Sequence, residues 1–215
     1  MRPEFRIPLT YLRLSGWMLA ALAVFAQLRT QGQIIQPSVV VSPGISFATL
    51  SGPTGAPYTG HSEGDFSVTV TGGTWQQSLA YGNPVASIFD GPTGSPGVAS
   101  LLITDNVDLF TFGSLDFSSN NGDSSYDIQG FQNSTMIYHQ TGTLAGSFTP
   151  FSFKTLTSDS PALQFDSLLI SVIPGADVTS INLDNIGVAT IPEPSAISFV
   201  AMAVLAVLGR ARART

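Results

Sequence analysis

The sequence predicts an all-β protein, an antiparallel β-sandwich of jelly-roll-like form, flanked by a signal helix at the N-terminus and a hydrophobic helix at the C-terminus. Short runs of β-branched and aromatic residues recur through the middle of the 215-residue chain, separated by clusters of Gly, Pro, Asn, Asp and Ser. No window between residues 38 and 190 keeps a sustained helical period with good helix formers. Only 10% of the residues are charged and none is Cys, which excludes a coiled coil and a disulfide scaffold.

The strands are expected where apolar runs are bounded by turn residues. Residues 66–70 alternate apolar and polar side chains, as in a sheet with one face in water. The expected strands cover residues 39–41, 45–50, 66–70, 98–103, 107–112, 115–117, 126–131, 135–139, 148–153, 168–173 and 181–188. Residues 120–123 (Asn-Asn-Gly-Asp) have the turn chemistry of a tight hairpin, and the Gly/Pro segments 52–57 and 91–97 are expected to be loops.

The first 26 residues are expected to be an export signal. Three arginines precede the apolar run 16–26, and polar sequence begins at Gln27. A basic start, a short apolar run and a small residue before the cut are typical of a secretory signal peptide, so cleavage is expected after Ala26, with a site nearer Gly32 as the alternative. A membrane anchor is the other interpretation, but this run is too short to span a core of roughly 30 Å.

The chain ends in three consecutive parts. Pro192, Glu193 and Pro194 end any preceding strand, because proline lacks an N–H donor. Residues 196–208 are apolar on every face and would form a helix of about 20 Å, a weak stop-transfer segment. The arginines that follow it favour a cytoplasmic C-terminus with the body outside. These are Arg210, Arg212 and Arg214.

This tripartite tail resembles the PEP-CTERM sorting signal of Gram-negative bacteria over residues 191–215. The resemblance implies signal peptidase and an exosortase, an intramembrane cysteine transpeptidase, as partners during export, with transient anchoring in the inner membrane. It also implies a location at the cell surface or outside the cell, in connection with extracellular polysaccharide and biofilm. An ordinary tail anchor is the alternative.

The body carries a second resemblance. The segments 112–117, 126–131, 165–170 and 181–186 recur in this order in exported PEP-CTERM proteins, whose bodies look like carbohydrate-binding modules or galactose-binding-like jelly rolls. The resemblance implies that the final Leu-Asp-Asn-Ile strand is central and next to the opening strand. The expected divisions are a signal peptide at 1–26, an N-terminal segment with the first strands at 27–60, the sandwich at 61–190 and the sorting signal at 191–215.

Charge and residue types narrow the function. The formal net charge is -6, but residues 27–190 hold 12 acidic residues against two basic ones, a net of -10 that disfavours nucleic acid. The absence of Cys excludes thiol catalysis, and neither histidine, His61 or His139, is near a Gly-x-Ser-x-Gly motif. Two converging carboxylates in a cleft would indicate a glycosidase.

Calcium is the metal that an acidic, loop-rich sandwich favours, because it takes oxygen ligands. The jelly-roll resemblance implies a structural site that joins an early acidic residue, Glu63 or Asp65, to Asp184 on the last strand. The alternative is that Asp184 is paired locally and that Glu63 and Asp65 belong to a solvated turn. Two scattered imidazoles without a thiolate disfavour zinc.

Sugar binding would use a flat exposed aromatic ring beside amide groups. Trp75, followed by two glutamines, and Tyr81 are the predicted glycan contacts, with Tyr126 and Tyr138 as further candidates and a core position as the alternative for each. The sequence therefore predicts a non-enzymatic exported protein that is structural or associates with extracellular polysaccharide. The alternatives are a secreted polysaccharide-active hydrolase and a cell-surface adhesin.

Overall fold

The computed structural model describes residues 44–91, 97–106, 108–149 and 152–191. These residues belong to one compact unit, Val41–Thr215. The predicted signal peptide, the strand expected at 39–41 and the Pro-Glu-Pro, apolar and Arg parts of the tail lie outside the described residues. Within the described part all regular structure is β-strand, and no helix there is long and apolar enough to cross a membrane.

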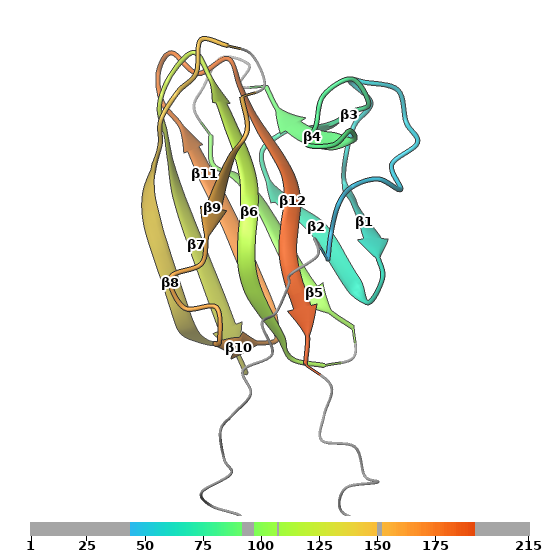
Figure 1. Ribbon diagram of the computed structural model, residues 1–215, viewed down its shortest axis with the longest axis vertical. Coiled ribbons are helices and arrows are strands. Elements are labelled where there is room, and N and C mark those ends of the chain that lie inside the picture. The colour runs from blue at the N-terminus through green and yellow to red at the C-terminus, as the bar shows by residue number, and fades with distance from the viewer. Residues whose placement is uncertain (1–43, 92–96, 107, 150–151, 192–215) are drawn as a thin grey trace, which may run out of the picture. The chain divides into compact units, whose positions relative to one another are not determined.

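Two antiparallel sheets pack face to face (Figure 1), which confirms the predicted fold class. Sheet 1 runs in the order β1 (Gly60–Glu63), β2 (Phe66–Gly72), β5 (Ala99–Asp105), β11 (Ser167–Pro174), β7 (Ser124–Gln132) and β8 (Thr135–Leu144). Sheet 2 runs in the order β10 (Gln164–Phe165), β6 (Phe110–Asn120), β12 (Ser180–Thr190), β4 (Ser87–Asp90) and β3 (Trp75–Ser78), and β9 (Lys154–Thr157) also pairs with β6.

The core lies between the sheets because each strand alternates inward apolar and outward polar side chains. Phe110 packs edge-on against Phe165 with ring centroids 5.1 Å apart, and Tyr138 stacks on the same Phe165 ring. The segment before β1 joins this core, since Ile45 and Phe47 are fully buried. The packed core therefore draws on residues that precede position 61.

The final strand is central, as the jelly-roll resemblance implies. β12 lies between β6 and β4, and Ile45, from the opening segment, forms a bridge with Ile186. β6 begins at Phe110 and joins residues 110–112 and 115–117, which were expected in two separate strands; Gly113 lies within β6, at a register shift in its pairing with β12. A register shift follows Asp184, where Asn185 has a positive φ of 43°.

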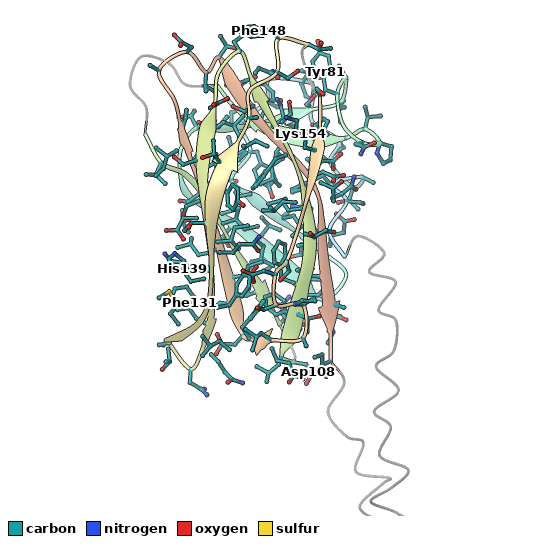
Figure 2. The ribbon with its side chains drawn as sticks, turned by 60° about the vertical axis from the view of Figure 1, so that its left-hand side comes forward. Tyr81, Asp108, Phe131, His139, Phe148 and Lys154 are labelled. Atoms are coloured by element: carbon teal, nitrogen blue, oxygen red, sulfur yellow. The ribbon has the colours of Figure 1, made fainter. Side chains whose placement is uncertain are left out.

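Three local predictions were wrong. Residues 45–50 form a bridge and a turn, since Phe47 has a φ of 58°. The described residues of 148–153 form no strand, and Phe148 is 87% exposed at one end of the sandwich (Figure 2). Residues 120–123 do include a left-handed Asn121, but they carry the chain from β6 in sheet 2 to β7 in sheet 1, so they form no hairpin.

Candidate functional site

Two carboxylates face each other on the outer side of sheet 2. Asp184 on β12 is opposite Asp116 on β6 in the antiparallel register. Their neighbours Leu183 and Phe117 are in the core, so alternation turns both carboxylates away from it. Asp184 is nevertheless fully buried and Asp116 almost so, because other segments cover this part of the sheet. We call Asp116 and Asp184 the buried carboxylate pair.

The loop between β3 and β4 supplies most of the cover. The backbone N–H of Asn83 donates to Asp184 Oδ2 at 2.5 Å, and the Asn83 side-chain amide donates to Asp116 Oδ2 at 3.2 Å. Asn185 adds its own N–H to Asp184 Oδ1 at 2.8 Å, while its amide donates to Asp116 Oδ2 and to the carbonyl of Asn83. Thr155 Oγ1 on β9 donates to Asp116 Oδ1 at 2.6 Å. Every oxygen of the pair thus accepts a hydrogen bond from the protein.

Burial and the neighbouring negative charges disfavour the ionised form of Asp184. Burial raises the pKa of Asp184 to about 7, and the nearby charges of Asp116 and Glu63 act in the same direction. The backbone hydrogen bonds from Asn83 and Asn185 oppose this rise in the pKa. Asp184 therefore has the elevated pKa of a general acid, but the pair lies under a loop and its oxygens already have partners. This geometry suits a structural role, in which the pair holds the β3–β4 loop on sheet 2, better than a hydrolytic site.

Asn182 lies on the same side of β12 as Asp184, two residues earlier. Its side chain is fully buried, and within the described residues neither its amide nitrogen nor its carbonyl oxygen has a hydrogen-bond partner. An unpaired buried amide costs about 1–3 kcal/mol unless a water or another ligand satisfies it. Asn182 thus adds a buried polar group on the same side of β12 as Asp184.

Glu63 and Asp65 make their hydrogen bonds with other residues. Glu63 Oε1 accepts the N–H and the hydroxyl of Ser46 at 3.1 and 2.5 Å, and Oε2 accepts the N–H of Phe47 at 2.9 Å. Burial works to raise the pKa of Glu63, but these bonds and one from His61 lower it overall. The backbone carbonyl of Asp65 accepts bonds from Asn106. Glu63 therefore fastens the opening segment to β1.

The structure does not gather the three predicted calcium ligands into one group. Among the described residues there is no cluster of three or more His, Cys, Asp or Glu side chains suited to a metal ion. Asp184 is paired with Asp116, while Glu63 binds Ser46 and Phe47. The hydrogen bonds of Asp184 come from Asn83 and Asn185, and the calcium site stays a prediction.

Trp75 takes the core position that was the alternative to a glycan contact. Its side chain is buried, with the residue only 2% exposed, and its Nε1–H donates to the carbonyl of Gly72 at 3.0 Å, so no ring face is open to a sugar. Tyr138 is buried and Tyr126 packs against the core. Tyr81 is 39% exposed in the loop that covers the carboxylate pair, near the end of the sandwich where Phe148 lies (Figure 2).

The outer side of sheet 1 is a broad open surface. Its strands send their core residues inward, so the alternate residues line up in rows across the sheet. One row contains His139, Gln129, Leu169, Leu102 and Thr69 on β8, β7, β11, β5 and β2. The next contains Thr141, Asp127, Ser171 and Ser100, and a third contains Phe131, Ser167, Thr104 and Ser67. We call these three rows the sheet-1 outer face.

Polar and apolar groups meet at one side of this face. His139 Nε2 lies 3.2 Å from Asp127 Oδ1, with the two side chains 47% and 34% exposed. Gln129 is directly opposite His139 and is followed in its row by two half-buried leucines. Figure 2 shows Phe131 and His139 on the same side of the sandwich. The arrangement offers a carboxylate, an amide and an imidazole beside an apolar strip.

Sequence reasoning missed Asp116 and the outer-face residues. Asp116 stands between Leu115 and Phe117, and an acid flanked by two core residues on a strand is a sign of an outward carboxylate. Its pairing with Asp184 depends on the register of two strands that are far apart in sequence. The alternation with inward residues also indicated that three polar side chains point outward: Asp127, Gln129 and His139.

The two sheets define an antiparallel β-sandwich with an open outer face. No protein-family model matches the chain, and a search of curated proteins found no similar one. Among solved structures it is similar to the enzymatically active domain of bacteriophage CBA120 tailspike protein 4, with 15% identity and a TM-score of 0.43 over 59% of this chain and 19% of the tailspike. It therefore spans about a fifth of that protein.

Two further structures are similar at the same level. A DUF4465 family protein from Bacteroides caccae has 11% identity and a TM-score of 0.42, over 67% of this chain and 91% of its own. A mutant of the family 29 carbohydrate-binding module CBM29-2, complexed with mannohexaose, has 20% identity and a TM-score of 0.39, over 64% and 88%. At these values the likeness concerns the β-sandwich alone and carries no argument about ligand or activity.

Proposed function

We propose that this chain is a non-enzymatic, polysaccharide-associating protein that acts outside the cell, and that the sheet-1 outer face is its contact surface. The observation that carries the proposal is the juxtaposition of Asp127, Gln129 and His139 beside Leu169 and Leu102 on an open sheet. Carboxylate, amide and imidazole groups exchange hydrogen bonds with sugar hydroxyls. The adjacent leucines suit the apolar C–H faces of sugar rings.

The shape of the surface favours a polymer over a small ligand. The first row crosses five neighbouring strands, so a chain of sugars would find successive contact positions along it. The described part of the chain is acidic with Lys154 as its one Lys or Arg, which favours neutral polysaccharide over an anionic one. Tyr81 is a further exposed aromatic, although it belongs to the loop on sheet 2.

A hydrolase is the competing function, and the buried carboxylate pair is the one observation in its favour. The distances and burial speak against it, because substrate has no access to Asp184 while Asn83 and Asn185 hold both carboxylates. A reducing-sugar assay on any polysaccharide that the protein binds separates the two functions. Release of sugar by wild type, with loss in the Asp184→Asn variant, would establish the hydrolase.

Glycan-array screening followed by affinity electrophoresis of the full-length chain tests the binding. The double variant Gln129→Ala/His139→Ala is expected to bind the best polysaccharide at least tenfold more weakly, about 1.4 kcal/mol. For a matched control, Asp127→Asn is compared with Asp177→Asn, since Asp177 is exposed in the turn before β12. Equal binding by all four proteins, or no binding by wild type, would contradict the proposed surface.

The proposed route out of the cell depends on the ends of the sequence. Signal peptidase would remove residues 1–26, and an exosortase would cut near Pro192, Glu193 and Pro194 after transient anchoring in the inner membrane. Intact-mass analysis of the protein recovered from the cell surface or medium tests both cuts. A product that retains Arg210, Arg212 and Arg214 would rule out exosortase processing and leave the ordinary tail anchor.

A further inference from the structure

Strand β8 forms the long free edge of sheet 1. It contains ten residues, Thr135–Leu144, and lies last in the sheet order with β7 as its neighbour (Figure 1). Within the described residues, its backbone is hydrogen-bonded only to β7. A row of unpaired N–H and C=O groups at a sheet edge is a template for another strand.

The other sheet edges are short or covered. β3 has four residues, and the segment before β1 runs along it, with the N–H of Tyr58 donating to Trp75 and the N–H of Gln77 donating to Ala56. β1 also has four residues and ends on Glu63. β9 and β10, which pair with β6, have four and two residues. Natural sheets protect their edges in these ways. β8 has a bulge at Ile137, and the segment 157–159 hydrogen-bonds to the side chains of Tyr138 and Gln140, but over residues 138–144 no described segment other than β7 bonds to the β8 backbone.

The composition of β8 suits a partner of its own kind. The strand contains no Asp, Glu, Lys, Arg or Pro, and its His139 is already beside Asp127. Because the chain is acidic, with a formal net charge of -6, two copies repel each other at most surfaces. The β8 edge is a place where a second copy approaches without adding an acidic side chain from either strand.

We propose that β8 pairs antiparallel with β8 of a second copy of this chain, about a two-fold axis at Thr141. The register shift of the β7–β8 ladder lies between Gly130 and Phe131, so the part of β8 beyond it, 138–144, is regular. A register that pairs all seven of these residues is centred on Thr141 and joins two six-stranded sheets into one.

The side chains are compatible with this register. Thr141 faces Thr141 of the second copy, and His139 faces Thr143, all on the outer side of the sheet. On the inner side, Tyr138 faces Leu144. Pairs of β-branched and aromatic–aliphatic residues across antiparallel strands are favourable, and no like charges meet.

Cysteine cross-linking tests the pairing and its register. The chain has no Cys, so Thr141→Cys introduces a single thiol at the proposed axis. Directly opposite residues of antiparallel strands have Cα atoms about 4.5–5.5 Å apart, within the range of a disulfide. The full-length chain, kept in a mild detergent because of its apolar ends, is oxidised and analysed without reductant. Thr69→Cys, an exposed position on the same face in the interior strand β2, is the control.

Thr141→Cys is expected to give a disulfide-linked dimer that a reductant converts back to monomer, whereas Thr69→Cys is expected to remain monomeric. Equal cross-linking of the two variants, or none in Thr141→Cys, would overturn the proposal. A second measurement uses lysine. Thr141→Lys places two ammonium groups opposite each other and is expected to raise the dimer dissociation constant at least tenfold in sedimentation, with Thr69→Lys unchanged. A wild-type chain that is monomeric at about 100 µM would also overturn it.

Discussion

The buried carboxylate pair makes a quantitative prediction about how stability depends on pH. Burial raises the pKa of Asp184 from 3.8 to about 7 in the folded chain, with a further rise from the charge of Asp116. A folded state that holds a proton more tightly than the unfolded state is favoured at low pH. The stabilisation of the folded state by this proton is therefore fully present below about pH 4 and is lost as the pH rises through about 7.

The size of the effect follows from the shift. Each pKa unit corresponds to about 1.4 kcal/mol, so raising the pH from 5 to 8, past the folded pKa of about 7, removes stabilisation equal to nearly two pKa units, about 3 kcal/mol. In Asp184→Asn the side chain is neutral at every pH, and this loss disappears. The variant also places an amide N–H against the donor of either Asn83 or Asn185, which costs about 1–3 kcal/mol at all pH values.

Urea unfolding at pH 5, 6, 7 and 8 measures both quantities. Wild type is expected to lose about 3 kcal/mol more than Asp184→Asn between pH 5 and pH 8, with similar m-values. Because each protein is compared with itself across pH, the constant cost of the amide cancels. Asp177→Asn, which changes an exposed carboxylate, should follow wild type. If Asp184→Asn kept the wild-type pH dependence, the raised pKa of Asp184 would be refuted.

Three further predictions concern the contacts that fasten the fold. Asn185→Ala loses two side-chain hydrogen bonds and places Ala at a φ of 43°, whereas Asn185→Gly loses the same bonds without the backbone strain. In urea unfolding, the Ala variant should therefore have a free energy of unfolding about 1–2 kcal/mol lower than that of the Gly variant. Equal free energies of unfolding in the two variants would contradict this. Hydrogen bonds hold the pKa of Glu63 low, so its charged carboxylate stabilises the folded state at neutral pH and loses this effect as the pH falls. In Glu63→Gln the free energy of unfolding should therefore change less between pH 7 and pH 3 than it does in wild type. Trp75→Phe loses the bond to Gly72 and should lower stability by about 1 kcal/mol while leaving glycan binding unchanged; weaker binding would restore Trp75 as a contact.

The sequence predicted the sheets best where strands alternate clearly. The runs at 66–70, 126–131, 168–173 and 181–188 all fall within observed strands, because buried residues recur in them mostly at a period of two. β3, β4 and β9 were missed, since four residues are too few to show a period. The strand expected at 148–153 was wrong because a short aromatic run resembles a strand, although Phe148 is exposed in a loop.

The candidate site was harder to predict than the fold. Asp184 was recognised as a special residue from its place in the last strand, but its true partner is Asp116 and its covering residue is Asn83, about a hundred positions away along the chain. Such pairings follow from strand order and register, which local patterns do not encode. The same reason explains Trp75, which a loop after Gly72 turns into the core.

The acidic composition has a structural explanation that does not require cations. Several carboxylates accept backbone N–H groups at turns: Asp90 binds Thr74, Asp123 binds Gly146, Asp166 binds Asn133, Asp105 binds Asp108, and Glu63 binds Ser46 and Phe47. A loop-rich sandwich leaves many N–H groups outside its ladders, and a carboxylate satisfies them more strongly than a neutral acceptor does. Asp184 follows the same pattern, since it accepts the N–H groups of Asn83 and Asn185, but its burial makes its charge unfavourable near neutral pH.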